Sequence, residues 1–286
     1  MTPVEQTYPE VTAVIPTLQK ITVSPSPTLS INKKASSTPL PPIVIEQPTR
    51  EVTLQVDQDL LERKFPSASI QIVKPGPLSR LVSPITVQAN VYPGENGLVS
   101  VQLIGEDGRV MAEQLLKRSQ SESGWVQMIT TFKFELPAAG ESATIVVSTR
   151  DAYGRRIAQA TVKVLLLQLG KNEIEPPGFG KQPFVVDVPF SGATIKGGKV
   201  QISGFAHSFN ANPVIFELIT QTGGVMTFKV ITLPKIAQEQ DYAAYEVEIP
   251  YEVNSRTSVR LTIRERLEYL PEIDVALSSQ LVYLDP

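Results

Sequence analysis

The residues of this chain that are able to do chemistry are few and scattered. The single histidine, His207, follows a segment in which apolar residues alternate with polar ones. A hydrolase triad would pair it with a nucleophile on a Gly-x-Ser-x-Gly turn, and this motif does not occur in the sequence. Because the chain has no cysteine, a zinc site at His207 would need carboxylates for its other ligands. His207 is therefore expected to be a structural or surface residue.

Carboxylates are the next candidates, because a pair of them can hydrolyse glycosides and a cluster can bind calcium. Glu246 and Glu248 share one face of an expected strand, while Asp107, Asp151 and Asp187 stand at turns or strand ends. No EF-hand loop is present. The glutamates are expected on a solvated strand face and the aspartates in turns, so no catalytic, cofactor-binding or metal-ligating residue is assigned.

Aromatic side chains in a row would indicate a carbohydrate-binding surface. The one tryptophan, Trp125, and the tyrosines Tyr92, Tyr242 and Tyr269 form no such row in the sequence. Trp125 begins an expected strand, where packing at the edge of a sandwich is the ordinary role of an unpartnered aromatic residue.

Composition excludes several classes of protein. The 26 Lys and Arg residues nearly balance the 29 Asp and Glu residues, which argues against a surface for nucleic acid or anionic membrane. The absence of cysteine excludes disulfides and cysteine nucleophiles. No apolar run approaches the roughly 18 residues of a membrane span, and the residues after Met1 do not have the pattern of a signal peptide.

The chain contains a duplication of one strand pattern. Residues Ser83–Val91 alternate between apolar and polar, and the pattern returns 115 positions later in Gly198–Ala206. The segments that follow each copy also recur in order, with turn signals between them. Short strands separated by such turns, with no helix of ten or more residues, are typical of an immunoglobulin-like Greek-key sandwich. The expected fold is therefore all-β, with two such sandwiches in tandem.

Two local features of the first repeat give more specific expectations. The dipeptide Asp107-Gly108 lies between two strand-like segments and predicts a hairpin in which both turn residues have positive φ. In the last strand, Leu165, Leu167 and Leu169 should point away from the core. Since an exposed row of leucines favours aggregation, they are expected to meet the leader or the second sandwich.

The domain boundaries follow from changes in composition. Residues 1–66 are expected to be a disordered or extended stalk, because the first 50 contain nine Pro, eight Thr and five Ser and no Gly. Within this leader, 51–56 alternate like a strand and 57–65 favour one or two helical turns. The first sandwich is placed at 67–169, a linker rich in Gly and Pro at 170–183, and the second sandwich at 184–286.

Each repeat carries a series of strand and turn motifs. The first copy has Ile72-Val73-Lys74-Pro75-Gly76-Pro77, then Val82–Val87 and the hairpin Leu103…Gly108-Arg109-Val110. The second copy has Pro189–Ile195, Val200–Ala206 and Leu218…Gly223-Gly224-Val225. With these motifs the two repeats resemble the immunoglobulin-like domain of bacterial spore-germination and related envelope proteins, and the second copy is the closer match. This resemblance implies an exported bacterial protein, often lipid-anchored, with an interaction or accessory role and no catalytic residues.

The expected function is therefore a non-enzymatic protein of the bacterial cell envelope, extracellular or otherwise extracytoplasmic, that uses tandem immunoglobulin-like domains for protein interaction, adhesion or scaffolding. Its expected partner is another envelope or surface protein, or a polysaccharide, with no nucleic acid, no cofactor, and a membrane only through an anchor outside this chain. The alternatives are a carbohydrate- or peptidoglycan-binding accessory module of a larger secreted system, and an enzyme, which the absence of a catalytic motif disfavours.

Overall fold

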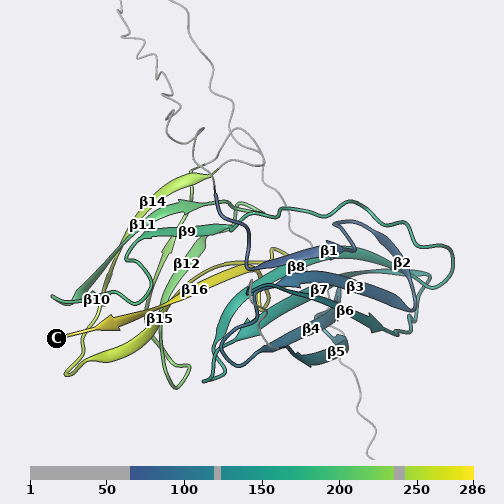
Figure 1. Cartoon of the computed structure of the whole chain (residues 1–286). Helices are drawn as coiled ribbons and strands as arrows, with labels where there is room; N and C mark the ends of the chain where they lie inside the picture. The colour runs from purple at the N-terminus through teal and green to yellow at the C-terminus, as the bar shows by residue number, and fades with distance from the viewer. Residues whose placement is uncertain (1–64, 119–123, 235–241) are drawn as a thin grey trace, which may run out of the picture. The chain divides into compact units, whose positions relative to one another are not determined.

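The computed structural model describes residues 65–118, 124–234 and 242–286 (Figure 1), and all of its regular elements are β-strands. The expected all-β class is confirmed. The expected stalk lies outside the described residues except for Phe65 and Pro66, and so do the strand expected at 51–56 and nearly all of the helical turns expected at 57–65.

The first half of the described chain forms two facing layers around one core. One layer is a three-stranded sheet in the order β1-β3-β6, and the other runs β5-β4-β7-β8 with the short β2 pairing parallel to β8. The strands of this half are β1 (Ile70–Lys74), β2 (Arg80–Val82), β3 (Ile85–Val91), β4 (Leu98–Gly105), β5 (Val110–Lys117), β6 (Val126–Phe132), β7 (Gly140–Arg150) and β8 (Arg156–Leu167).

The second half repeats this arrangement strand for strand. Its three-stranded sheet runs β9-β11-β14, its other layer runs β13-β12-β15-β16, and the short β10 pairs parallel to β16. The strands are β9 (Phe184–Val188), β10 (Thr194–Ile195), β11 (Lys199–Ala206), β12 (Val214–Thr220), β13 (Val225–Ile231), β14 (Ala243–Pro250), β15 (Thr257–Arg266) and β16 (Asp274–Leu284).

The larger layers of the two halves are joined into one ten-stranded sheet. Three residue pairs in β8 and β16 make the junction: Ala158 with Ser278, Gln159 with Leu277, and Ala160 with Ala276. We call this junction and the residues packed beside it the seam. Each half keeps its own apolar core between its two layers. A smaller buried cluster joins Ile104 and Val146 of the first half to Leu267 and Leu270 of the second, so the halves share a sheet and a minor core.

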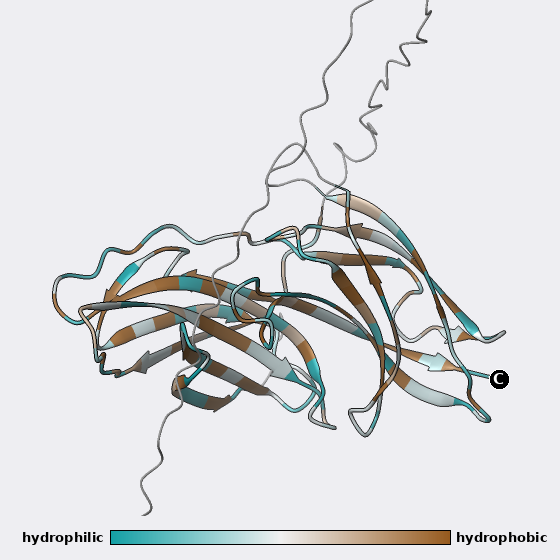
Figure 2. Ribbon diagram, turned by 180° about the vertical axis from the view of Figure 1, so that it is seen from behind, coloured by the Kyte–Doolittle hydropathy of each residue, from teal (hydrophilic) through white to brown (hydrophobic). Residues whose placement is uncertain are grey.

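Alternation of side chains explains why these segments form strands. In β3, Ile85, Val87, Ala89 and Val91 are each at most 1% exposed, whereas the intervening residues are half-buried or exposed, as the sequence predicts. Hydrophobic and hydrophilic residues alternate along the strands in Figure 2. The aligned strand of the second half, β11, buries Val200 and Ile202 completely.

The hairpin between β4 and β5 forms as expected, but its turn differs from the prediction. Gly108 has φ of 83°, as expected, whereas Asp107 is not among the residues with positive φ, so the expectation was wrong for Asp107. The amide of Gly108 donates to the carbonyl of Gly105, and the amide of Gly105 donates to that of Arg109. The loop therefore has three residues and needs only one left-handed residue, its last.

The outward leucines of β8 have different surroundings. Leu165 and Leu167 are half-buried and lie in the part of the strand that pairs with β2, whereas Leu169 is 84% exposed. The expectation that all three meet the leader or the second sandwich is wrong for Leu169, and the strand that pairs with Leu165 and Leu167 belongs to the first half. The connector at 170–183 makes backbone hydrogen bonds to the first half, from Glu173 to Arg80 and from Gln182 to Pro66.

Candidate functional site

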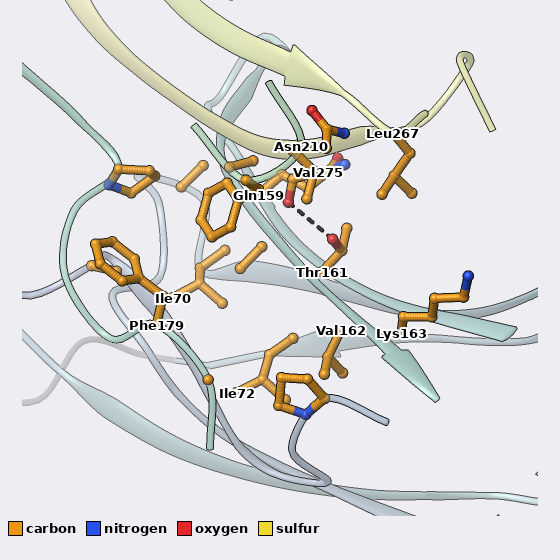
Figure 3. A pocket seen from close by; sticks show the side chains of 18 of the residues that line it. Ile70, Ile72, Gln159, Thr161, Val162, Lys163, Phe179, Asn210, Leu267 and Val275 are labelled. Carbon is orange, nitrogen blue, oxygen red and sulfur yellow. Dashed lines mark hydrogen bonds between the residues drawn. The ribbon is translucent and has the colours of Figure 1, made fainter. Parts of the chain in front are cut away.

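A pocket of about 380 Å³ opens at the seam (Figure 3). Its walls come from six places in the chain: residues 68–72 at the start of β1, Pro77 after β1, 158–163 of β8, 178–183 of the connector, 209–210 after β11, and 267–269 with 275–276 around the start of β16. The pocket exists only because the two halves meet, since each contributes part of its wall.

The interior of the pocket is apolar. Ile70, Val162 and Leu267 are each at most 7% exposed and line it. The polar side chains in the wall use their hydrogen bonds elsewhere: Thr161 Oγ1 donates to the carbonyl of Val275 at 3.0 Å, the dashed line of Figure 3, and Gln159 Nε2 donates to that of Asp274 at 2.5 Å. A ligand in this pocket would therefore meet mainly aliphatic groups and the rings of Phe179, Phe209 and Tyr269.

The charged groups lie at the rim. Lys163, Lys181 and Glu268 are the charged residues of the lining. The ammonium nitrogen of Lys163 lies 4.1 Å from the centre of the Tyr269 ring, and the Tyr269 hydroxyl shares a hydrogen bond of 3.0 Å with Thr144 Oγ1. Figure 3 shows the Lys163 side chain extending away from the apolar centre. The two ammonium groups outnumber the one carboxylate.

His207 belongs to the aromatic packing beside the pocket. It is 5% exposed, and its ring stacks on that of Phe179, with centroids 4.1 Å apart and planes 9° apart. Phe209 meets both rings edge-on. The half-buried Phe179 and the exposed Phe209 also line the pocket. The only histidine of the chain is thus placed in a stack of rings, which is a structural position.

Asp151 is the centre of a buried ion-pair network that crosses the seam. Its Oδ1 accepts hydrogen bonds from the amides of Tyr153 and Arg155, which hold the turn as expected. Its Oδ2 accepts from Nε of Arg155 at 2.7 Å and from Nε of Arg260 in the second half at 2.6 Å. Burial raises the pKa of Asp151, but the hydrogen bonds from Arg260 and Arg155 outweigh it, so the net shift is below the usual value.

A second chain of ion pairs runs beside the first. Arg264 donates to both oxygens of Glu217, at 2.7 and 3.1 Å, and to Oδ1 of Asp274 at 2.8 Å. Asp274 Oδ2 also lies 3.0 Å from Nη1 of Arg156 in β8. Burial lowers the pKa of Arg264, but Glu217 and Asp274 together raise it by more than burial lowers it. Arg264 therefore stays charged. Two separate ionic links therefore join the halves.

These ionic links border a second, polar hollow of about 650 Å³. Its lining includes five arginines, Glu217, Glu272 and the exposed Tyr153. These residues come from the segment 150–156, from β12 and β15, and from the loop before β16, and the β12–β13 turn completes the lining. The lining arginines are Arg150, Arg155, Arg156, Arg264 and Arg266. Three of them are held by the carboxylates of the network.

The other carboxylates that the sequence singles out lie apart from both pockets. Asp107 pairs with Arg109 at 2.9 Å within its turn. Glu248 pairs with Lys199 at 2.7 Å on an exposed strand face, and Glu246 and Asp187 lie in β14 and β9. Within 65–118, 124–234 and 242–286, no group of three His, Asp or Glu residues is placed to hold a metal ion.

The four aromatic residues considered for carbohydrate binding do not gather. Trp125 meets Tyr92 edge-on, with ring centroids 6.2 Å apart. Tyr242 is 5% exposed and donates its hydroxyl to the Gln182 carbonyl at 2.7 Å, and Tyr269 lies at the rim of the apolar pocket. Among the described residues there is also no helix able to cross a membrane.

Sequence reasoning missed the arginines of the seam. Arg260 and Arg264 occupy alternate positions of β15, and such positions ordinarily face solvent. A signal was present in the segment Val259–Glu265, where charged residues interrupt a run of buried apolar ones. The partner of Arg260 lies 109 residues away, at Asp151, and the partners of Arg264 lie 47 and 10 residues away, at Glu217 and Asp274. No local pattern connects these residues.

Comparison with known proteins identifies no family for this chain. No protein-family model and no curated protein matches it. Among solved structures, red sea bream transglutaminase is similar at 9% identity with a TM-score of 0.29, over 80% of this chain and 33% of that one. The chain thus spans about a third of the length of the transglutaminase.

Two further structures are similar at the same low level. CBD12 from CALX1.2 has 12% identity and a TM-score of 0.19, over 69% of this chain and 81% of that one. A chimeric titin Z1Z2 functionalized with a KLER exogenous peptide from decorin has 15% identity and a TM-score of 0.20, over 78% of this chain and 98% of that one. TM-scores below 0.5 do not establish a shared fold.

Proposed function

We propose that this chain is a non-enzymatic, extracytoplasmic protein of the bacterial envelope, in which two immunoglobulin-like sandwiches on an extended leader serve protein interaction, adhesion or scaffolding. The strand order supports the sandwich assignment. In each half a three-stranded sheet faces a four-stranded one across an apolar core, and a short strand is added parallel to the last strand, as in two-layer Greek-key sandwiches.

The observation that carries the proposal is that the buried charged side chains are engaged in ion pairs with one another. Asp151, Arg155, Arg260 and Asp274 are each at most 6% exposed, and each is engaged in ion pairs that join strands or halves. An acid or base for catalysis must reach a substrate. These groups instead hold the two halves together, which suits a protein that presents surfaces.

The surfaces proposed for interaction are the strands at the two ends of the ten-stranded sheet. β13 exposes Phe228 and Val230, which are 61% and 45% accessible, and β5 exposes Leu115, which is 62% accessible. Each of these strands pairs with a single neighbour among the described strands, β12 or β4. Exposed apolar side chains on such strands favour contact with another chain.

Site-specific photo-crosslinking in the bacterium that carries this gene tests the proposal. A photoreactive amino acid is placed at Phe228 or Leu115, and at the exposed Lys196 as a control. We expect covalent adducts with a discrete envelope protein from the first two positions and none from Lys196. The proposal fails if the protein fractionates with the cytosol, if no adduct forms, or if purified protein has a hydrolase activity that changes at its acidic residues abolish.

The polar hollow favours a second candidate, binding of a cell-wall carbohydrate. Arginine and carboxylate groups can form bidentate hydrogen bonds with neighbouring hydroxyls, and the ring of Tyr153, 60% exposed, lies at the edge of the hollow. Co-sedimentation with insoluble wall polysaccharide tests it. The candidate predicts retention that Tyr153→Ala weakens at least tenfold, whereas retention equal for the two proteins, or none, contradicts it.

A further inference from the structure

We infer that the apolar pocket at the seam is a binding site for a small amphiphilic anion, a molecule with one aliphatic body and one carboxylate head group. The inference does not depend on the proposed interaction role. It rests on the volume and lining of the pocket, on the hydrogen bonds that its polar wall groups already make within the protein, and on the excess of positive charge at its rim.

The volume and lining suit an aliphatic body. Pockets that bind small ligands begin at roughly 300 Å³, are lined mainly by apolar side chains, and orient the ligand with a few polar groups. The seam pocket has about 380 Å³. Because Thr161 and Gln159 donate to backbone carbonyls of the opposite half, the wall offers few donors to a polar ligand, whose burial without hydrogen bonds would be costly.

The rim determines the sign of the head group. Lys163 contacts the face of the Tyr269 ring, an interaction that leaves its N–H groups available to an acceptor. The Lys181 ammonium group has no hydrogen-bond or ion-pair partner within 65–118, 124–234 and 242–286. Against these two positive charges the lining holds one carboxylate, Glu268. A carboxylate head at the mouth would therefore be attracted, whereas an amine would be repelled.

The chain itself provides a set of matched variants. Lys163→Met and Lys181→Met remove the charge but keep most of the apolar stem, so packing along the wall is preserved. Lys229→Met makes the same change at an exposed position on β13, remote from the lining. Ala160→Phe introduces a ring into the pocket from β8.

The experiment is a calorimetric titration of the full chain with monomeric decanoate, decan-1-ol and decylamine. We expect saturable binding of one decanoate and at least tenfold weaker binding of the alcohol and of the amine. In NMR spectra of the same chain, decanoate should shift the methyl resonances of Ile70 and Leu267. The double variant K163M/K181M should bind decanoate at least tenfold more weakly, and Lys229→Met should bind it as the unchanged chain does.

Three results would overturn the inference: no saturable decanoate binding, alcohol binding as tight as decanoate binding, or unchanged affinity in K163M/K181M. Ala160→Phe should abolish binding while its thermal unfolding remains cooperative. If this variant fails to fold, the comparison of decanoate with decan-1-ol on the unchanged chain and the lysine variants still decides the question.

Discussion

Arg260 Nε donates a hydrogen bond of 2.6 Å to Asp151 Oδ2, and the two residues come from different halves of the chain. The side chains are 5% and 0% exposed. Since Arg155 donates to the same oxygen, one carboxylate balances two buried guanidinium groups, with Glu95 reaching Arg260 from the exposed side at 3.2 Å. Asp151 and Arg260 thus link the two halves through a buried ion pair, and removal of Asp151 would leave the charges of Arg155 and Arg260 without this partner.

Replacement of Arg260 by methionine should destabilise the chain by about 3 kcal/mol, the lower end of what breaking a buried ion pair costs, because Asp151 retains Arg155. The free energy of unfolding in urea measures the effect. As a matched control, Arg256→Met removes an exposed arginine that lies over the Tyr283 ring, and it should change stability by less than about 0.5 kcal/mol. Equal effects of the two substitutions would contradict the role given to Arg260.

The same carboxylate predicts how stability depends on pH. The pKa of Asp151 is lowered in the folded state, so its contribution is fully present above the ordinary value of 3.8 and is lost as the pH falls towards the folded-state pKa. Asp151→Asn removes this contribution at every pH. We therefore expect the stability difference between the unchanged chain and Asp151→Asn to be largest near pH 7 and to shrink below about pH 4. Urea unfolding between pH 7 and pH 3 tests this, and a difference that grows towards acid pH would refute it.

Gly204 in β11 should not tolerate a side chain. A Cβ at this position would fall on the carbonyl oxygen of Val185 in the paired strand β9, close to the Tyr245 hydroxyl that donates to the same oxygen. Gly204→Ala should therefore cost about 1–3 kcal/mol through overpacking. Gly180→Ala is the control, because nothing lies within 4 Å of its Cβ position. Thermal unfolding of the two variants measures the difference, and a Gly204→Ala variant as stable as Gly180→Ala would show that β9 and β11 do not approach so closely.

The core of the second half gives another matched pair. Phe216 is 0% exposed and packs against Tyr245 with ring centroids 5.0 Å apart, whereas Phe228 on the neighbouring strand is 61% exposed. Phe216→Ala should reduce the free energy of unfolding by about 3–5 kcal/mol. Phe228→Ala should reduce it by no more than about 1 kcal/mol. Chemical denaturation of both variants is the measurement, and similar losses would mean that the exposed face of β13 is covered in solution.

The strands of each half could be predicted from the sequence because their signal is local. Period-two alternation marks β3 and β11, and the glycines Gly108 and Gly223, both with positive φ, mark the hairpin turns. The repeat at a fixed offset strengthened both assignments. The turn at Asp107 was misjudged because the dipeptide alone does not determine the loop length, which the pairing of Gly105 with Arg109 sets.

The seam could not be predicted, because the repeat marks β8 and β16 as counterparts but does not indicate that they pair. Pairing of β8 with β16 uses three residues in each strand, and nothing in these residues signals a partner 116 to 120 residues away. The apolar pocket depends on the same contact. Asp151 was recognised as a turn residue, and its bond to Arg260 was missed because a carboxylate at a turn ordinarily faces water.

The pairing of β8 with β16 also bears on what would happen if the chain were cut between the halves. In each fragment, the backbone groups of the three paired residues of β8 or β16 would lose their partners. Asp151 would lose Arg260, and Asp274 would lose Arg156. Unpaired strand segments of this kind favour association with other chains. The pairing of β8 with β16 therefore protects each half from associating with the wrong chain.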